Sequence, residues 1–291
     1  MHAHTLSPGS PVAVIGAGTM GHGIAHVCAL AGHPTRLYDV TLTAAQAGLD
    51  KIQDNLRKGV AKGKIAQGEL DAALDRLSIH ETIPAAVADT SAVIEAVPEI
   101  LALKRSLLGT VAQHVAVDTI LASNTSSLSI ASIAEGLAHP ERVIGLHFFN
   151  PVHVMKLLEI VRAELTHPDV VEACRGFGER IGKTCIVVAD TPGFATSRLG
   201  LVIGLEAMRM VEQGVASAQD IDTAMKLGYG FPMGPLELTD LVGLDVRLKI
   251  AEYLSQALPD GAHFTPPQIL RDKVASGHLG KKSGQGFYTW G

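Results

Sequence analysis

Residues 12–23 read VAVIGAGTMGHG, an apolar run that opens into three glycines spaced as G-x-G-x-x-G. The run 12–15 predicts a buried strand, and the residues after the third glycine predict a helix. Gly16 allows the strand to turn sharply, Gly18 leaves the backbone open to a ligand, and Gly21 lets the helix approach closely. A strand, a tight turn and a helix in this order predict a parallel α/β sheet with a dinucleotide-binding turn.

The acid that follows the glycine turn predicts which dinucleotide binds. Asp39 comes directly after a second apolar run, residues 35–38, and lies 23 residues after Gly16. A carboxylate at this place accepts hydrogen bonds from the hydroxyls of the adenosine ribose and repels a 2′-phosphate. We therefore expect NAD rather than NADP, with the ribose on Asp39. The contacts expected on the turn are Gly16, Gly18, Thr19, Met20 and Gly21.

Segments typical of strands and of helices alternate over the first two thirds of the chain. The strand-like runs are residues 12–15, 35–38, 92–96, 120–123, 143–147, 157–161 and 185–188. The longer segments with helical spacing are residues 20–32, 43–62, 100–115 and 129–137. This alternation predicts a mainly parallel, doubly wound sheet with helices on both faces. The second helical segment is rich in Lys and Arg, and we expect it to project as a basic arm.

The pattern changes at residues 190–193, which read DTPG. Beyond this point no strand is predicted, and four segments have helical spacing or helix-start signals. They are residues 197–212, a helix that opens at the Ser217-x-x-Asp220 capping box and stops near Gly228, residues 235–258, and residues 267–276. We therefore expect an α/β domain over residues 1–189 and an all-helical domain over residues 190–291.

The composition is typical of a globular protein and argues against several classes of partner. Of 291 residues, 47% are hydrophobic and 18% are charged, and the formal net charge is −5. This charge gives no reason to expect a nucleic acid as a partner. No apolar run is long enough to cross a bilayer, and residues 1–11 lack the regions of a signal peptide. We therefore expect a cytoplasmic protein without a membrane partner.

The sequence predicts neither a disulfide framework nor a metal site. Cys28, Cys174 and Cys185 are few, odd in number and widely spaced, which suits a reducing compartment and buried thiols. His22 and His26 have the i,i+4 spacing of a metal-binding pair, but no third ligand follows them. Because the helix after the glycine turn accounts for both histidines, we expect no bound metal.

A histidine and a glutamate in two apolar runs point to acid–base chemistry. His147 ends the run 143–147, at the carboxyl edge where doubly wound sheets bind ligands. Glu159 lies between Leu158 and Ile160, so a buried carboxylate there needs a partner. If the two segments are adjacent, Glu159 accepts the Nδ1 proton of His147, and Nε2 is available as a general base. Oxidation of an alcohol needs such a base, although a structural histidine and an exposed glutamate fit the spacing equally well.

Several longer stretches make the chain similar to a known enzyme family. They read GAGTMGHGIA (16–25), IEAVPE (94–99), ASNTSSLSI (122–130), HFFNPVHVMKLLEI (147–160), DTPGF (190–194), GPLELTDLVGLD (234–245) and KKSGQGFY (281–288). With these segments in this order, the chain resembles the L-3-hydroxyacyl-CoA dehydrogenases, in particular the bacterial single-function 3-hydroxybutyryl-CoA dehydrogenases. The resemblance implies a Rossmann-like domain, a helical domain that forms a homodimer, NAD as cofactor, and an acyl-CoA in the cleft between the domains.

The resemblance also implies roles for individual residues. His147 and Glu159 match the family's catalytic pair, and Ser126 matches the serine that bonds the substrate oxygen at C3. Asn150 matches an asparagine that contacts the nicotinamide end of the cofactor or the substrate. The further matches are Glu99, Lys104 and Lys282 to cofactor contacts, and Lys62 to a lysine that reaches the CoA phosphates.

Two positions depart from the family pattern. Ser197 stands before Arg198 where many relatives have an asparagine that joins the active-site hydrogen bonds. A serine is shorter and has one hydroxyl instead of an amide, so a bridging water is needed to reach the thioester carbonyl. Asn55 stands where a serine contacts CoA in some relatives, and its amide can still donate a hydrogen bond.

The resemblance implies reversible oxidation of an (S)-3-hydroxyacyl-CoA to the 3-oxoacyl-CoA, with 3-hydroxybutyryl-CoA and acetoacetyl-CoA as the short-chain pair. Its metabolic setting is open between β-oxidation of fatty acids, butanoate metabolism and degradation of aromatic acids. One alternative is a dehydrogenase of a free hydroxy acid or sugar acid, for which Lys62 has no role. Another is a crystallin-like structural protein with a vestigial site, which the presence of both His147 and Glu159 disfavours.

Overall fold

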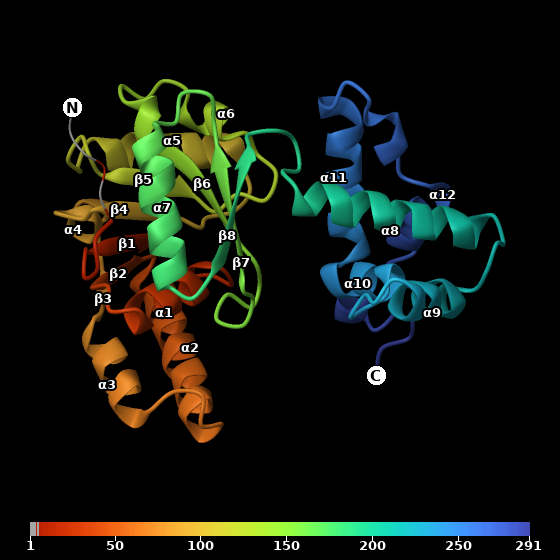
Figure 1. Ribbon diagram of the computed structural model, residues 1–291, viewed down its shortest axis with the longest axis horizontal. Coiled ribbons are helices and arrows are strands. Elements are labelled where there is room, and N and C mark those ends of the chain that lie inside the picture. The colour runs from red at the N-terminus through yellow and green to blue at the C-terminus, as the bar shows by residue number, and fades with distance from the viewer. Residues whose placement is uncertain (1–3, 5) are drawn as a thin grey trace. The chain divides into compact units, whose positions relative to one another are not determined.

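The computed structural model describes residue 4 and residues 6–291, and the chain forms two units, Met1–Thr191 and Pro192–Gly291 (Figure 1). Residues 1–3 and 5 belong to the stretch in which no signal peptide is predicted, and they lie outside the described residues. None of the helices in the described part of the chain has the length and apolar character needed to span a bilayer.

One sheet of eight strands forms the centre of the first unit, as far as the described residues show. The strands are β1 (Val12–Ile15), β2 (Thr35–Tyr38), β3 (Leu77–His80), β4 (Ala92–Glu95), β5 (Ile120–Ser123), β6 (Val143–Phe148), β7 (Leu157–Arg162) and β8 (Thr184–Ala189). Their order across the sheet is β3-β2-β1-β4-β5-β6-β7-β8. Neighbouring strands are parallel except for the antiparallel pair β6 and β7, which confirms the predicted, mainly parallel α/β sheet.

Helices lie on both faces of this sheet (Figure 1). They are α1 (Gly21–Leu30), α2 (Leu42–Ala61), α3 (Gln67–Asp75), α4 (Ile83–Val87), α5 (Leu101–Ala112), α6 (Ile130–Ala134), α7 (Pro168–Arg180) and the 3₁₀ helix η1 (Pro140–Arg142). Side chains of α1, α2 and α7 share one apolar core with β1, β4 and β6. Burial of this core is the main force that holds the sheet and its helices together.

The long helix α2 carries the predicted basic segment. Its buried positions, Ala45, Gly48, Ile52 and Leu56, follow one stripe of the helix, and the rest of its surface is exposed or half-buried. In Figure 1, α2 and α3 extend beyond the sheet as a helical hairpin. A helix that packs along one stripe leaves its charged face in water, which agrees with the predicted arm.

The second unit is all-helical in its described residues, as predicted. Its helices are α8 (Thr196–Glu212), α9 (Ala218–Gly228), α10 (Pro235–Val242), α11 (Leu244–Ala257), α12 (Gln268–Ala275) and the 3₁₀ helices η2 (Gly261–Phe264) and η3 (Lys281–Ser283). At the start of α9 the Ser217 hydroxyl accepts a hydrogen bond from the backbone N–H of Asp220, 3.1 Å away, as the capping box predicts.

The single helix predicted over residues 235–258 is wrong. Gly243 separates α10 from α11, and its φ of 105° lies outside the helical region. The apolar spacing continues across the break, so the pattern alone does not reveal it. A glycine can adopt this conformation at little cost, and it lets the chain change direction between two short helices.

A buried acid joins the end of α10 to residues 286–290. The Asp240 side chain is inaccessible to solvent and accepts three hydrogen bonds. The backbone N–H groups of Phe287 and Tyr288 donate at 2.8 Å, and the indole N–H of Trp290 donates at 2.9 Å. Because a buried carboxylate is stable only with such donors, residues 286–290 are part of the structure of the second unit.

The three cysteines carry free thiols. Cys28 and Cys174 are buried, as predicted, whereas Cys185 is half-buried on β8. Burial raises the pKa of the Cys28 thiol to about 12, so this group stays protonated and unreactive at neutral pH.

Candidate active site

The glycine turn joins β1 to α1 at the carboxyl edge of the sheet. Gly16 has a φ of 100°, and its N–H donates to the backbone oxygen of Tyr38 at 2.8 Å. A Cβ atom on Gly21 would lie 1.6 Å from the backbone oxygen of Gly16, so this position accepts only glycine. A Cβ atom on Gly18 would meet nothing within 4 Å among the described residues, which leaves this backbone open to a ligand.

Asp39 is held over this turn by the backbone on both sides. The N–H of Ala17 donates to its Oδ2 and the N–H of Val40 to its Oδ1, both at 2.7 Å. Asp39 also lines a cavity of about 620 Å³ together with Gly16, Gly18, Thr19 and Met20. An open glycine backbone beside an oriented carboxylate fits the diphosphate and adenosine ribose of NAD.

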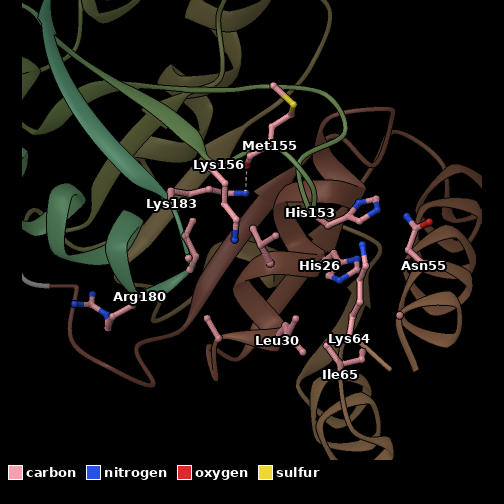
Figure 2. Close-up of a pocket in the computed structure, with 15 residues that line it drawn as sticks. His26, Leu30, Asn55, Lys64, Ile65, His153, Met155, Lys156, Arg180 and Lys183 are labelled. Carbon is pink, nitrogen blue, oxygen red and sulfur yellow. Dashed lines mark hydrogen bonds between the residues drawn. The ribbon is translucent and has the colours of Figure 1, made fainter. Parts of the chain in front are cut away.

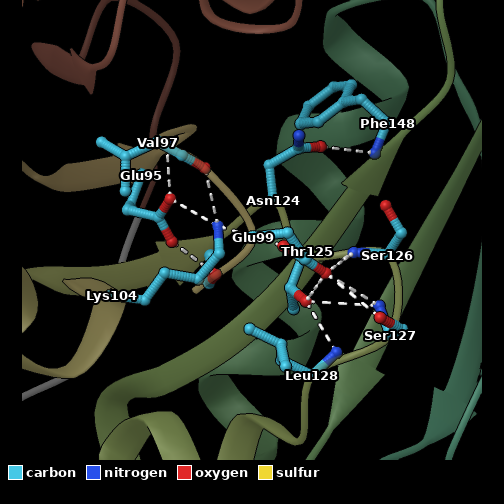
Figure 3. Close-up of polar contacts among 11 residues, drawn as sticks. Glu95, Val97, Glu99, Lys104, Asn124, Thr125, Ser126, Ser127, Leu128 and Phe148 are labelled. Carbon is cyan, nitrogen blue, oxygen red and sulfur yellow. Dashed lines mark hydrogen bonds and ion pairs between the residues drawn. The ribbon is translucent and has the colours of Figure 1, made fainter. Parts of the chain in front are cut away.

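A buried ion pair lies at the carboxyl end of β4 (Figure 3). The Lys104 ammonium is 2.7 Å from Glu95 Oε1 and 3.4 Å from Glu99 Oε2. The side chains of Lys104 and Glu95 are inaccessible to solvent, whereas that of Glu99 is 37% exposed. The family resemblance implies that Lys104 contacts the cofactor. Its ammonium is buried here, so its contribution to the cofactor site is to hold the carboxylate of Glu99 in place.

Glu99 in turn orders the loop that carries Ser126. Its Oε1 accepts hydrogen bonds from the Thr125 hydroxyl at 2.6 Å, from the N–H of Ser126 at 2.9 Å, and from the N–H of Ser127 at 3.1 Å (Figure 3). The carboxylate therefore gathers three donors from one turn of backbone, which fixes where the serine lies relative to the end of β5.

Two residues that the sequence patterns did not single out support this loop. Asn124 Oδ1 accepts a hydrogen bond from the N–H of Phe148 at 2.9 Å, which ties the loop to the end of β6. Glu95 Oε2 accepts from the Ser123 hydroxyl at 2.6 Å. Glu95 lies in the apolar run 92–96, so the argument that a carboxylate in such a run needs a partner could have found it.

His147 and Glu159 face each other across the antiparallel pair β6 and β7. The distance from Nδ1 of His147 to Oε2 of Glu159 is 2.7 Å, and their side chains are 8% and 0% exposed. An ionised carboxylate accepts hydrogen bonds only, so Nδ1 carries the proton and the imidazole lone pair is on Nε2. The register of two strands thus produces the arrangement of a general base with an orienting acid.

The structure divides the remaining expected site residues between the two units. In the first unit, Asn150 lies two residues after the end of β6. Asn55 lies on α2, and Lys62 lies at its C-terminal end. In the second unit, Ser197 lies in the first turn of α8. Lys282, expected at the cofactor, lies in η3 and forms an ion pair of 2.5 Å with Asp245.

Comparison with known proteins agrees with this geometry. The family model "3-hydroxyacyl-CoA dehydrogenase, NAD binding domain" matches residues 11–191, and "3-hydroxyacyl-CoA dehydrogenase, C-terminal domain" matches residues 193–290. The chain is 44% identical over 279 residues to a probable 3-hydroxybutyryl-CoA dehydrogenase of Bacillus subtilis, which covers 96% of each chain.

Solved structures give the same result. The (S)-3-hydroxybutyryl-CoA dehydrogenase PaaH1 of Ralstonia eutropha has a TM-score of 0.94 and 36% identity, over 97% of this chain and 99% of that one. FadB2 of M. tuberculosis has a TM-score of 0.91 and 39% identity, over 98% of this chain and all of that one.

Proposed function

We propose, from the premise that this chain belongs to the 3-hydroxyacyl-CoA dehydrogenase family, that His147 is the general base of an NAD-dependent oxidation of (S)-3-hydroxyacyl-CoA. The enzyme is an oxidoreductase of the family's type, and its product is the 3-oxoacyl-CoA. The single observation that carries the assignment of the base is the buried hydrogen bond between His147 and Glu159. We further propose 3-hydroxybutyryl-CoA as the substrate, because the relatives named above include enzymes of that name.

Each residue of the site contributes a defined part of the reaction. Nε2 of His147 takes the proton of the C3 hydroxyl, and the Glu159 carboxylate stabilises the imidazolium that forms. Ser126 and Asn150 hold the C3 oxygen so that the proton points at the imidazole. The glycine turn and Asp39 hold the cofactor, which when bound supplies the nicotinamide ring that accepts the hydride.

We also propose the remaining site roles, the domain limits and the assembly. Three residues are proposed to help bind the cofactor, directly or by positioning a neighbour: Glu99, Lys104 and Lys282. Three others are proposed to bind the CoA thioester: Asn55, Lys62 and Ser197. We propose domains over residues 1–189 and 190–291, and the separate matches of the two family models, to residues 11–191 and 193–290, support a boundary close to this one. Exposed apolar side chains on the second unit, such as Leu199, Leu227 and Tyr229 at 62%, 84% and 78%, support a homodimer through that unit. The bacterial relatives support a cytoplasmic location.

The direct test of this function is reduction of acetoacetyl-CoA, followed through the nicotinamide absorbance with NADH and, separately, with NADPH. We expect rapid consumption of NADH and slow or no consumption of NADPH, because the Asp39 carboxylate repels the 2′-phosphate. Rapid consumption with NADPH alone would overturn the role of Asp39. No consumption with either cofactor, in protein that still binds NADH, would overturn the substrate class, and free hydroxy acids would be tested next.

Replacing Asp39 with alanine should raise the KM for NADH about 10- to 100-fold and raise activity with NADPH. The reason is the loss of a charge-assisted hydrogen bond to the ribose, a contact of about 1.5–3 kcal/mol. The matched variant is Asp39→Asn, which keeps an acceptor for the N–H of Ala17 but removes the charge. It should gain NADPH activity with a smaller loss of NADH affinity. An unchanged preference for NADH in both variants would contradict the prediction.

A further inference from the structure

A second cavity in the first unit is lined by basic side chains (Figure 2). Its volume is about 340 Å³, and it lies between α1, the connection from α2 to α3, and the segment that follows Pro151. No Asp or Glu occurs among the described residues that line it. The basic side chains on its wall are His26, Lys64, His153, Lys156, Arg180 and Lys183. A concave site with this charge favours an anionic group.

Two stacked imidazoles form one wall of this cavity. The rings of His26 and His153 are parallel within 2°, and their centroids are 5.2 Å apart. His26 is 4% exposed, and its Nδ1 has no hydrogen-bond partner among the described residues. His153 is exposed. The buried ring of His26 therefore supports His153 through its flat face, while the polar edge of His153 remains accessible.

Hydrogen bonds from Lys183 hold the backbone of the segment that carries His153. The buried ammonium of Lys183 donates to the backbone oxygens of Val152 and Met155, the latter at 2.8 Å. Lys183 and the stacked ring of His26 together hold the main chain and the side chain of His153. Such a site is already arranged before a ligand binds, so little ordering entropy is lost on binding.

The charged groups that act on the imidazole of His153 are all basic among the residues that the structure describes. Burial lowers the pKa of His153, and His22, Lys183 and Lys64 lower it further. Burial, followed by His153 itself, lowers the pKa of His26 to about 4, so this ring is neutral at physiological pH. Lys156 and Arg180 complete the charged lining, and Asn55 of α2 is the uncharged polar side chain opposite. An anion in this cavity would remove the repulsion that opposes protonation of His153.

We propose that two residues not assigned above, His153 and Lys64, bind a phosphate group of the CoA part of the substrate beside the CoA contact already proposed for Asn55. We also propose that His153 takes up a proton from solvent as it does so, and that His26 is the positioning residue for His153. Figure 2 shows Lys64 reaching toward the two imidazoles, with Asn55 beyond them on α2. The protonated imidazole and the ammonium each donate a charge-assisted hydrogen bond to phosphate oxygens. This inference rests on the proposed function, because the ligand is part of an acyl-CoA.

The sign of the pH dependence follows from proton uptake. If the complex holds more protons than the free enzyme, affinity for the phosphate group rises as the pH falls. The KM for acetoacetyl-CoA should therefore fall between pH 8 and pH 6. A thioester of pantetheine has no phosphate, so its KM should not show this dependence. Comparing the two substrates therefore distinguishes protonation of His153 from protonation of His147, because His147 acts on the CoA and the pantetheine thioester alike.

The first experiment measures the KM for acetoacetyl-CoA and for acetoacetyl-pantetheine at pH 6 in wild type and in His153→Gln. We expect the KM for acetoacetyl-CoA to rise about 10- to 100-fold, the value of one charge-assisted hydrogen bond, with kcat and the pantetheine KM unchanged. His114→Gln, an exposed histidine elsewhere in the first unit, is the control and should match wild type. Equal effects of His153→Gln on both substrates would overturn the proposal.

The second experiment measures binding of adenosine 3′,5′-bisphosphate by calorimetry at pH 6.5, in two buffers of different ionisation enthalpy. Wild type should take up protons when it binds the bisphosphate, and His153→Gln should not. His26→Phe should still take up protons, because the phenylalanine ring can stack on His153 as the imidazole does. His26→Ala should weaken binding. Zero proton uptake in wild type, or loss of binding in His26→Phe to the extent of His26→Ala, would overturn the proposal.

One further experiment, together with two combinations of the results above, separates the possible failures. Inorganic pyrophosphate should compete with acetoacetyl-CoA, and its binding without competition would mean a site for free phosphate, which contradicts the assignment to CoA. Protein that binds the bisphosphate with proton uptake but does not reduce acetoacetyl-CoA would overturn the proposed function and keep the phosphate site. Activity with a KM that His153→Gln does not change would keep the function and overturn the phosphate site.

Discussion

Replacing His147 with glutamine should lower kcat for acetoacetyl-CoA reduction about 10²- to 10⁴-fold, the usual contribution of a positioned acid–base group. Glutamine has nearly the size of histidine and can still donate to Glu159, so the buried carboxylate keeps a partner. The dissociation constant for NADH should not change, because the glycine turn and Asp39 follow other strands, β1 and β2. Stopped-flow reduction and NADH fluorescence titration measure the two quantities.

The partner of His147 provides a sharper form of the same test. Glu159→Gln alone should lower kcat less than His147→Gln, because the imidazole remains but loses its charged partner. The double variant should be no slower than His147→Gln, since residues that act as a unit are not additive. His139→Gln, on the surface of the first unit, is the matched control. Turnover near that of wild type in His147→Gln would remove the base from the mechanism.

Replacing Lys104 with methionine should lower the free energy of unfolding of the first unit by about 3–5 kcal/mol, the cost of leaving a buried charge without its partner. Glu95 would keep the Ser123 hydroxyl and the N–H of Val97 but lose the ammonium at 2.7 Å. The urea midpoint, read by a probe of the first unit, measures the loss. Lys51→Met on the exposed face of α2 is the control and should change stability by less than about 0.5 kcal/mol.

The same variant tests whether the ion pair reaches the site. Glu99 would lose the cation 3.4 Å away and with it the support for the loop of Ser126. We therefore expect a higher KM for NADH and for acetoacetyl-CoA in Lys104→Met at temperatures where it is folded. Stability within about 0.5 kcal/mol of wild type would show that water or a rearranged side chain replaces the ammonium, which contradicts the prediction.

Most of the first unit follows from local patterns in the sequence. The seven predicted strands are short apolar runs, and burial on both faces of a parallel sheet produces such runs. The pattern does not predict β3, because Leu77–His80 reads LSIH and is not a continuous apolar run. The apolar pattern alone does not give the direction of β7, but residues 149–156 are too short a connection for a parallel crossover and favour the antiparallel pairing with β6 that the structure has.

The second unit shows a different limit of sequence patterns. Helical spacing predicts where apolar side chains gather, but the break at Gly243 keeps that spacing on both sides. A glycine in a long apolar helix is tolerated in many proteins, so only the backbone angle reveals the end of α10. The hydrogen bonds from residues 287, 288 and 290 to Asp240 connect positions about 50 residues apart, and no local pattern records such contacts.

The site was predictable where one strand register decides it. His147 is a base and Glu159 an acid, and each lies in an apolar run. The antiparallel pairing of β6 with β7 places the two residues opposite each other. The support of Ser126 by Glu99 was not predictable from spacing, because it depends on how two loops after β4 and β5 meet. The stack of His26 on His153 was missed for the same reason, since these residues lie on elements that are distant in the sequence.

Because Asp240 needs donors from residues 287–290, the second unit is the last part of a newly made chain to become complete. β8 ends at Ala189, about 100 residues before Trp290. At about 5–20 residues added per second, the ribosome finishes the sheet roughly 5–20 s before it supplies the last donor to Asp240. In that interval the nascent chain contains every strand, the glycine turn and Asp39. A first unit that folds at this stage would already hold the residues proposed to bind NAD, and binding would stabilise it before the second unit is complete.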